Sequence, residues 1–90
     1  MLSTIIKTDG TRHNIKPKNK TDFQLDELQE IVEGYIEIVP LSKTQIMVVN
    51  EEGHMLKKPY NHLATLTAYM SGIRDIIVGN VLVCDSNKVK

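Results

Sequence analysis

The length of the chain sets the tightest limit on its fold, because ninety residues fill only one hydrophobic core. The chain has no Trp, one Phe and three Tyr, so Ile, Val and Leu must supply most of that core. Its apolar fraction of 41% is typical of a globular protein. We therefore expect one domain over residues 1–90. Because so small a core gives a monomer little stability, we also expect self-association into a homo-oligomer.

The amino-terminal part of the chain predicts a hairpin. Residues 3–8 are typical of a first strand, and Asp9-Gly10 is a tight-turn dipeptide whose glycine takes a positive φ at little cost. Residues 11–15 then return as a second strand. Pro17, with the lysines around it, ends the hairpin in a loop.

The next segment predicts the first helix. Thr21 is placed to cap its first turn, with Gln24 at the capping-box position three residues later. Gly34 follows the last turn, where a left-handed residue ends many helices. Apolar residues recur at three- and four-residue spacing, and acidic residues fall largely on the other side. The apolar set is Leu25, Leu28, Ile31 and Val32, and the acidic set is Asp26, Glu27, Glu30 and Glu33.

The middle of the chain predicts three more strands. Residues 35–39 alternate in the manner of a half-buried strand, which Pro40 closes. Residues 45–49 are rich in branched side chains and form the next strand. Residues 50–53 are a turn, after which residues 54–57 are expected to run back as a hairpin partner.

A second helix is expected over residues 59–70, with Asn61 as its cap. Ser71-Gly72 ends it. Residues 75–78 and 81–84 are expected to be extended, with a corner at residues 79–80 between them. Residues 85–90 are expected to form a flexible tail. The whole pattern predicts an α+β fold with a small, mainly antiparallel sheet and two helices.

Several of these segments together resemble a small family of domains of unknown function that is common in bacteriophages, plasmids and conjugative elements. The segments are Gly34 to Val39, Val49 to Gly53, Pro59 to Asn61 with Ala64-Thr65, and Asp75 to Val83. The resemblance covers about two thirds of the chain and implies no catalytic residue. We interpret Gly34 as a helix stop, Gly53 as a turn residue and Gly79 as a strand corner, each needing backbone freedom.

Three features indicate a cytoplasmic protein, in the bacterial host that the resemblance implies. Cys84 is the single cysteine and lies in an apolar run, so we interpret it as a small buried residue in a reducing compartment. Residues 1–7 lack the long apolar stretch of a signal peptide. The most apolar segment, residues 76–84, is far shorter than the roughly 20 residues of a membrane-spanning helix.

The chain lacks the residue patterns of catalytic and metal sites. His13, His54 and His62 do not have the spacing of a tetrahedral metal site, and no Gly-x-Ser-x-Gly turn presents a nucleophile. Glu51 and Glu52 are adjacent in a turn, where their side chains diverge. The glycine patterns that bind phosphates or dinucleotides are absent. We therefore predict that the protein is not an enzyme and uses no metal or cofactor.

Cations and aromatic rings scattered over the chain are chemically adequate for an anionic, nucleotide-like ligand. An arginine guanidinium donates two parallel hydrogen bonds to a phosphate, and a tyrosine ring stacks on a base. As ordinary surface residues the same side chains need no ligand. The candidate ligand-binding set is Arg12, His13, Lys57, Lys58, Tyr60, Asn61, Tyr69 and Arg74.

Three functional hypotheses follow. The first is a counter-defence protein of a phage or mobile element that sequesters a nucleotide-type immune signal without turning it over. The alternative is an inhibitor or modulator of a host enzyme that binds through the acidic helix face, at Asp26, Glu27, Glu30 and Glu33. Direct nucleic-acid binding through Arg12, Lys16, Lys18 and Lys20 is a weaker third hypothesis, because eleven basic and eleven acidic side chains cancel.

Overall fold

Two strands that are apolar at almost every position form the centre of the molecule. β4 (Gln45–Asn50) and β5 (Val81–Asp85) pair antiparallel in the middle of a five-stranded sheet. Neighbouring side chains of a strand point to opposite faces, so such runs need cover on both sides. Met47, Val48 and Leu82 accordingly have no exposed surface.

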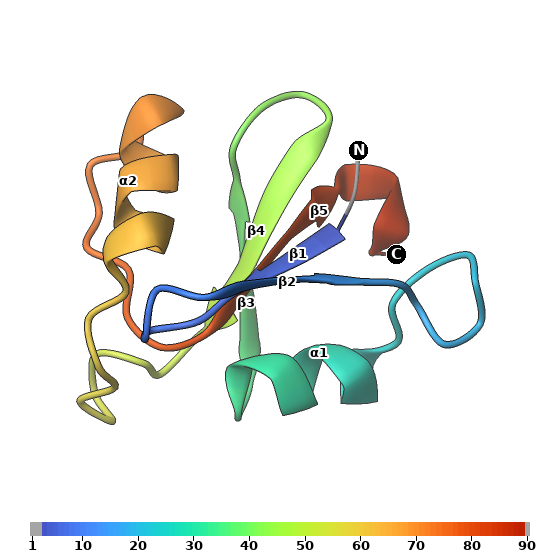
Figure 1. Cartoon of the computed structure of the whole chain (residues 1–90), viewed down its shortest axis with the longest axis horizontal. Helices are drawn as coiled ribbons and strands as arrows, with labels where there is room; N and C mark the ends of the chain where they lie inside the picture. Colours follow the sequence, from blue (N-terminus) through green and yellow to red (C-terminus); the bar gives the residue numbers. More distant parts are fainter. Residues whose placement is uncertain (1–2, 90) are drawn as a thin grey trace.

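The sheet has the order β2 (Arg12–Ile15), β1 (Ser3–Ile6), β5, β4, β3 (Ile36–Pro40), and every neighbouring pair is antiparallel. Helices α1 (Leu25–Val32) and α2 (His62–Met70) lie on opposite sides of it (Figure 1). The computed structural model describes residues 3–89. Its strands and helices confirm the expected α+β class.

The sheet divides the expected core into two halves, because the two helices pack on different faces. Under α1, Leu28 and Val32 contact the even-numbered side chains of β4, and Phe23 fills the space beside them. Under α2, Ala64 and Ala68 pack on the opposite face with Ile6, Met47, Val49, Val81 and Val83.

The predicted hairpin at the amino terminus is confirmed. Ser3 lies opposite Ile15, and Ile6 lies opposite Arg12. Gly10 has a φ of 89°, the positive value that the turn requires of it. β1 then forms the only link from this hairpin to β5 among the described sheet pairings.

Helix α1 begins three residues later than the sequence predicts. Its N-cap is Gln24, whose backbone N–H donates to the Glu27 carboxylate at 2.8 Å. Thr21 instead donates its hydroxyl to Asn19 Oδ1, within the preceding loop. The predicted cap at Thr21 is therefore wrong, because Phe23 must remain extended to bridge to Val89 and fill the core under α1.

The end of α1 also differs from the prediction. Glu33, with φ 63°, takes the left-handed position that we expected of Gly34. Gly34 is needed for space, since a Cβ there would lie 2.7 Å from Nδ2 of Asn50. That amide donates to the carbonyls of Val32 at 3.0 Å and Glu33 at 3.3 Å, and so attaches the end of α1 to the end of β4.

The chain after β4 does not return as a strand, so the predicted hairpin partner at residues 54–57 is wrong. Residues 51–57 form successive turns, closed by bonds such as Lys58 N–H to the Gly53 carbonyl at 2.9 Å. Both neighbouring positions in the sheet beside β4 are already occupied by β3 and β5. Gly53 serves close packing, because a Cβ there would lie 2.9 Å from the Val78 side chain.

Asn61 caps α2, as the sequence predicts, and the helix begins at His62. Its Oδ1 accepts from the Ala64 N–H at 3.0 Å. Its Nδ2 donates to the carbonyls of Ile6 at 3.0 Å and Gly79 at 2.8 Å. The extended residues 75–78 lie outside the sheet and contribute only a single bridge, from Val78 to Tyr60.

The last residues of the chain lie against the domain. Asp85 ends β5, Ser86–Lys88 form a short 3-10 helix, and Val89 bridges to Phe23 in parallel orientation. The flexibility that the sequence predicts for residues 85–90 stays a prediction.

Replacement of Asn61 by alanine is expected to destabilise the fold by about 3 kcal/mol, because it removes a helix cap and two buried hydrogen bonds to backbone carbonyls. Urea denaturation measures the change. Asn14→Ala is the matched control, since Asn14 is exposed and accepts one bond from Thr4 Oγ1. The control should cost less than about 0.5 kcal/mol. Equal stability of the two variants would contradict the role given to Asn61.

Candidate functional site

The eight residues of the predicted ligand set lie along different elements. Arg12 and His13 are exposed on β2, one of the two edge strands of the sheet. Lys57 is exposed in the turns after β4, whereas Lys58 forms an ion pair with Glu33 at 2.9 Å. Neither of the two grooves described below is lined by more than one member of the set.

The remaining members of the set differ in access to solvent. Tyr60 and Tyr69 are exposed by 51% and 62%, and Arg74 is also exposed. Asn61 has no exposed surface, and its amide is occupied by three bonds, one that caps α2 and two that it donates to the carbonyls of Ile6 and Gly79. A ligand therefore has no access to Asn61 in this structure.

The acidic face predicted for α1 is smaller than the spacing suggests. Glu27 is buried, and its two carboxylate oxygens accept from the backbone N–H groups of Lys18 at 2.9 Å and Gln24 at 2.8 Å. Glu33 is paired with Lys58. Asp26 and Glu30 remain exposed. Two of the four carboxylates therefore already have specific partners within the fold.

One groove arises because α2 covers only part of its face of the sheet. The odd-numbered side chains of β3 point to that face, and α2 packs over β5 and the middle of β4. Residues 74–78 pass beside the uncovered part. The result is an open groove of about 460 Å³, called the β3 groove here, whose floor is formed by Val39, Val49 and Ile77.

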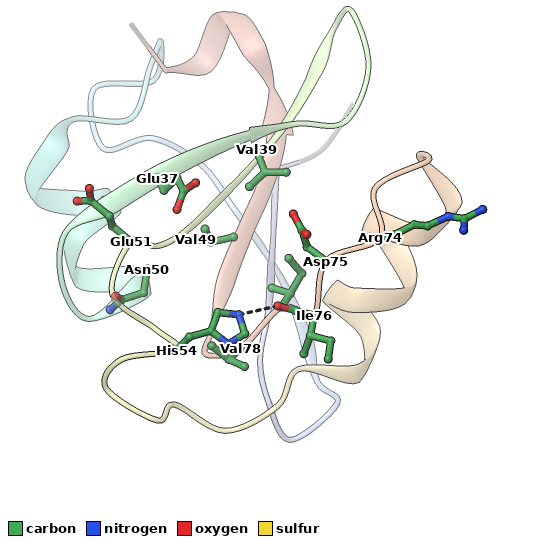
Figure 2. Close-up of a pocket in the computed structure, with 11 residues that line it drawn as sticks. Glu37, Val39, Val49, Asn50, Glu51, His54, Arg74, Asp75, Ile76 and Val78 are labelled. Atoms are coloured by element: carbon green, nitrogen blue, oxygen red, sulfur yellow. Dashed lines mark hydrogen bonds between the residues drawn. The ribbon is translucent and has the colours of Figure 1, made fainter.

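The exposed side chains around the β3 groove are mainly acidic. Glu37 from β3, Glu51 from the turn after β4 and Asp75 from the segment after α2 line it. In Figure 2, Glu37 and Asp75 lie on either side of Val49, and the Arg74 side chain extends away from the other labelled residues. Three carboxylates and one outward guanidinium give the groove a negative character.

His54 joins the two sides of the β3 groove. Its Nε2 lies 2.8 Å from the Ile76 carbonyl oxygen (Figure 2). Because a carbonyl oxygen only accepts, this nitrogen must carry the hydrogen. The bond connects the turn after β4 to the segment after α2, which are 22 residues apart in the chain. The imidazole is thereby held at the edge of the groove.

A second groove of about 370 Å³ lies between the first hairpin and α1. Ile5, Ile15 and Ile31 line it together with basic and acidic residues. The charged residues are Lys7, Lys16 and Lys18 from the hairpin and the loop after it, and Glu27, Glu30 and Glu33 from α1 and its end. Two of the lysines proposed for nucleic-acid binding, Lys16 and Lys18, thus share a groove with carboxylates, which weakens their attraction for a phosphate chain.

The structure gives no geometric support for a metal site or a membrane span within residues 3–89. No group of three or more His, Cys, Asp or Glu side chains in this range is arranged to hold a metal ion. Neither helix in the same range has the length and apolar character needed to cross a membrane.

A protein-family model described as a domain of unknown function, DUF3846, matches residues 4–89. The chain belongs to the DUF3846 family. The expectation that it resembles a family of unknown function is therefore confirmed. No curated protein and no solved structure matches this DUF3846 chain.

The segments that carried the family resemblance have structural roles in this DUF3846 domain. Gly34 and Gly53 leave room around Asn50, and Gly79, with φ 77°, presents its carbonyl to Asn61. The residues of the β3 groove were not recognised as a site from the sequence. Alternation in residues 35–39 places Glu37 and Val39 on one face, but which part of that face α2 covers depends on tertiary packing.

Cys84 has no exposed surface and lies in the core under α1, as the sequence predicts. Burial, with a smaller contribution from Asp85, raises the pKa of the thiol to about 11. The reactive thiolate is therefore scarce in the folded protein at neutral pH.

At pH 8 we expect iodoacetamide to alkylate Cys84 of the folded protein at least about 100-fold more slowly than Cys84 of the urea-unfolded chain. Mass spectrometry measures both alkylation rates. The pKa of the Cys84 thiol is higher in the folded protein than in the unfolded chain. The neutral thiol therefore contributes its full share of the free energy of unfolding below about pH 9, and this contribution is lost as the pH rises through about 11. Cys84→Ala should flatten that loss. Equal labelling rates for folded and unfolded protein would contradict this assignment.

Proposed function

We propose that this DUF3846 chain is a non-catalytic accessory protein of a phage or mobile genetic element, which binds a basic segment of a host protein in the β3 groove and so inhibits or redirects that protein. The observation that supports it is the combination of an apolar floor with exposed carboxylates from three separate parts of the chain. The proposed mobile-element origin rests on the family resemblance stated above.

Arginine and lysine are the side chains that suit such a groove. Each has an apolar stem and a cationic end, so the stem packs on Val39, Val49 and Ile77 while the cation reaches Glu37 or Asp75. An arginine also donates two parallel hydrogen bonds to one carboxylate. A basic protein segment therefore matches both the polarity and the charge of the β3 groove.

The same geometry favours a protein partner over the nucleotide-type signal of our first hypothesis. An anionic ligand placed in the β3 groove would meet Glu37, Glu51 and Asp75, and like charges at short range cost several kcal/mol. Sequestration of a nucleotide would need the cations and tyrosines of the predicted set to gather, for example between subunits. We retain the alternative hypothesis of a protein-directed modulator and move its acidic surface from α1 to the β3 groove.

An amide chemical-shift titration of the isotope-labelled protein tests the proposal. The probes are an arginine-rich decapeptide and a glutamate-rich decapeptide at low salt. We expect the arginine peptide to shift the amides of Glu37, Val39, His54 and Asp75, and the glutamate peptide to shift none of them. Binding should weaken as ionic strength rises, because the contacts are between charges near the surface.

A charge-reversed pair of variants provides the specific control. The double variant Glu37→Lys with Asp75→Lys should lower the affinity for the arginine peptide at least about tenfold, equivalent to about 1.4 kcal/mol. The matched variant Asp26→Lys with Glu30→Lys changes the same net charge on the exposed side of α1. It should change affinity less than about threefold. Equal losses in the two variants, or shifts confined to α1, would refute the groove as the binding site.

A further inference from the structure

The fully buried residues of helix α2 are small, and most of its large residues are exposed. Ala64 and Ala68, which face the sheet, have no exposed surface. Leu66, Tyr69 and Met70 are exposed by 46%, 62% and 80%. An ordinary surface helix has the opposite arrangement, with charged residues on the exposed side. The exposed residues of α2 are therefore unusual for a surface that only contacts water.

These exposed residues form a continuous strip along the helix. Four of them lie on one side of α2, because successive members are four, three and one residues apart along the helix. They are His62, Leu66, Tyr69 and Met70. Tyr60 extends the strip before the first turn, since its ring centroid lies 6.0 Å from that of His62. We call Tyr60, His62, Leu66, Tyr69 and Met70 the α2 strip.

The α2 strip carries no formal charge. No Asp, Glu, Lys or Arg occurs between Lys58 and Arg74, although about a quarter of the chain is charged. In a two-fold contact between identical chains, residues near the axis meet their own copies, so a charge there would face the same charge. An uncharged strip avoids that repulsion. Tyr, Leu and Met are also side chains that pack in the dry centre of protein interfaces.

The exposed area is also sufficient for a pair of chains. Large side chains expose about 200 Å² each when fully accessible, so the α2 strip presents about 500 Å² on one copy. Two copies would bury about 1,000 Å² in total, which is near the lower limit for a specific interface. The strip thus matches a weak, reversible dimer in area as well as polarity.

We infer that the α2 strip is the interface of a homodimer in which the α2 helices of two copies pack antiparallel about a two-fold axis beside Leu66. In that arrangement Leu66 contacts Leu66 of the second copy. His62 and Met70 are equally spaced from residue 66, so each lies opposite the other across the axis. The inference concerns a surface separate from the β3 groove and does not depend on the proposed function.

Sedimentation velocity at about 10 to 200 µM tests the inference. The wild-type chain of 10.2 kDa should approach twice that mass as concentration rises. Leu66→Glu should remain monomeric over the whole range, because two carboxylates would meet at the axis. The matched control is Leu25→Glu, which introduces the same change at a residue of α1 that is 57% exposed and should dimerise as the wild type does. Circular dichroism of both variants verifies folding.

Mixing two charged variants distinguishes the two-fold contact from any other association. An equimolar mixture of Leu66→Glu and Leu66→Lys should recover the dimer, although each variant alone is monomeric. Leu66→Cys should form a disulfide-linked dimer on mild oxidation, whereas Thr11→Cys at the exposed hairpin turn should not. The inference is overturned by a monomeric wild type at 200 µM, by a dimeric Leu66→Glu variant, or by a mixture that stays monomeric.

Discussion

Two buried asparagine side chains hold the helices of this domain to its sheet. Asn50, at the end of β4, donates to the carbonyls that end α1. Asn61 caps α2 and donates to carbonyls at the end of β1 and just before β5. A buried amide without partners costs several kcal/mol, so these contacts allow few alternative arrangements. No buried side-chain nitrogen or oxygen among the described residues lacks a partner.

This constraint gives three glycines of the chain a structural role. Gly34 and Gly53 leave room around Asn50, and Gly79 supplies a carbonyl for Asn61. The chain belongs to a family of unknown function, and a fold does not by itself identify a function, so function must be sought on the surfaces of the domain. Two such surfaces are distinctive in this chain. One is the acidic β3 groove beyond the edge of α2, and the other is the uncharged α2 strip.

Local chemistry allowed correct prediction of the elements whose signals are contained in a few residues. The turn at Asp9-Gly10, the cap at Asn61 and the apolar positions Leu28, Ile31 and Val32 of α1 depend on neighbours within four residues, and these are confirmed. Leu25, the fourth apolar position predicted for that face, is wrong, because it lies in the first turn of α1 and is exposed by 57%. The errors depend on distant contacts. Glu27 is buried because it caps α1 and binds the Lys18 backbone, and residues 54–57 form turns because β5 already pairs with β4. The β3 groove was missed for the same reason, since its lining residues come from three separated segments.

The attachment of both helices to the sheet depends most on the Asn50 and Asn61 amides being part of the folded core. Hydrogen exchange of their side-chain NH₂ protons, measured by NMR in deuterated buffer, tests it most directly. We predict that the Nδ2 protons of both residues exchange only when the whole domain unfolds. Their exchange rates should then equal those of the slowest backbone amides of β4 and β5. Exchange of these side-chain protons at the rate of the exposed Asn14 amide, while β4 and β5 stay protected, would contradict it.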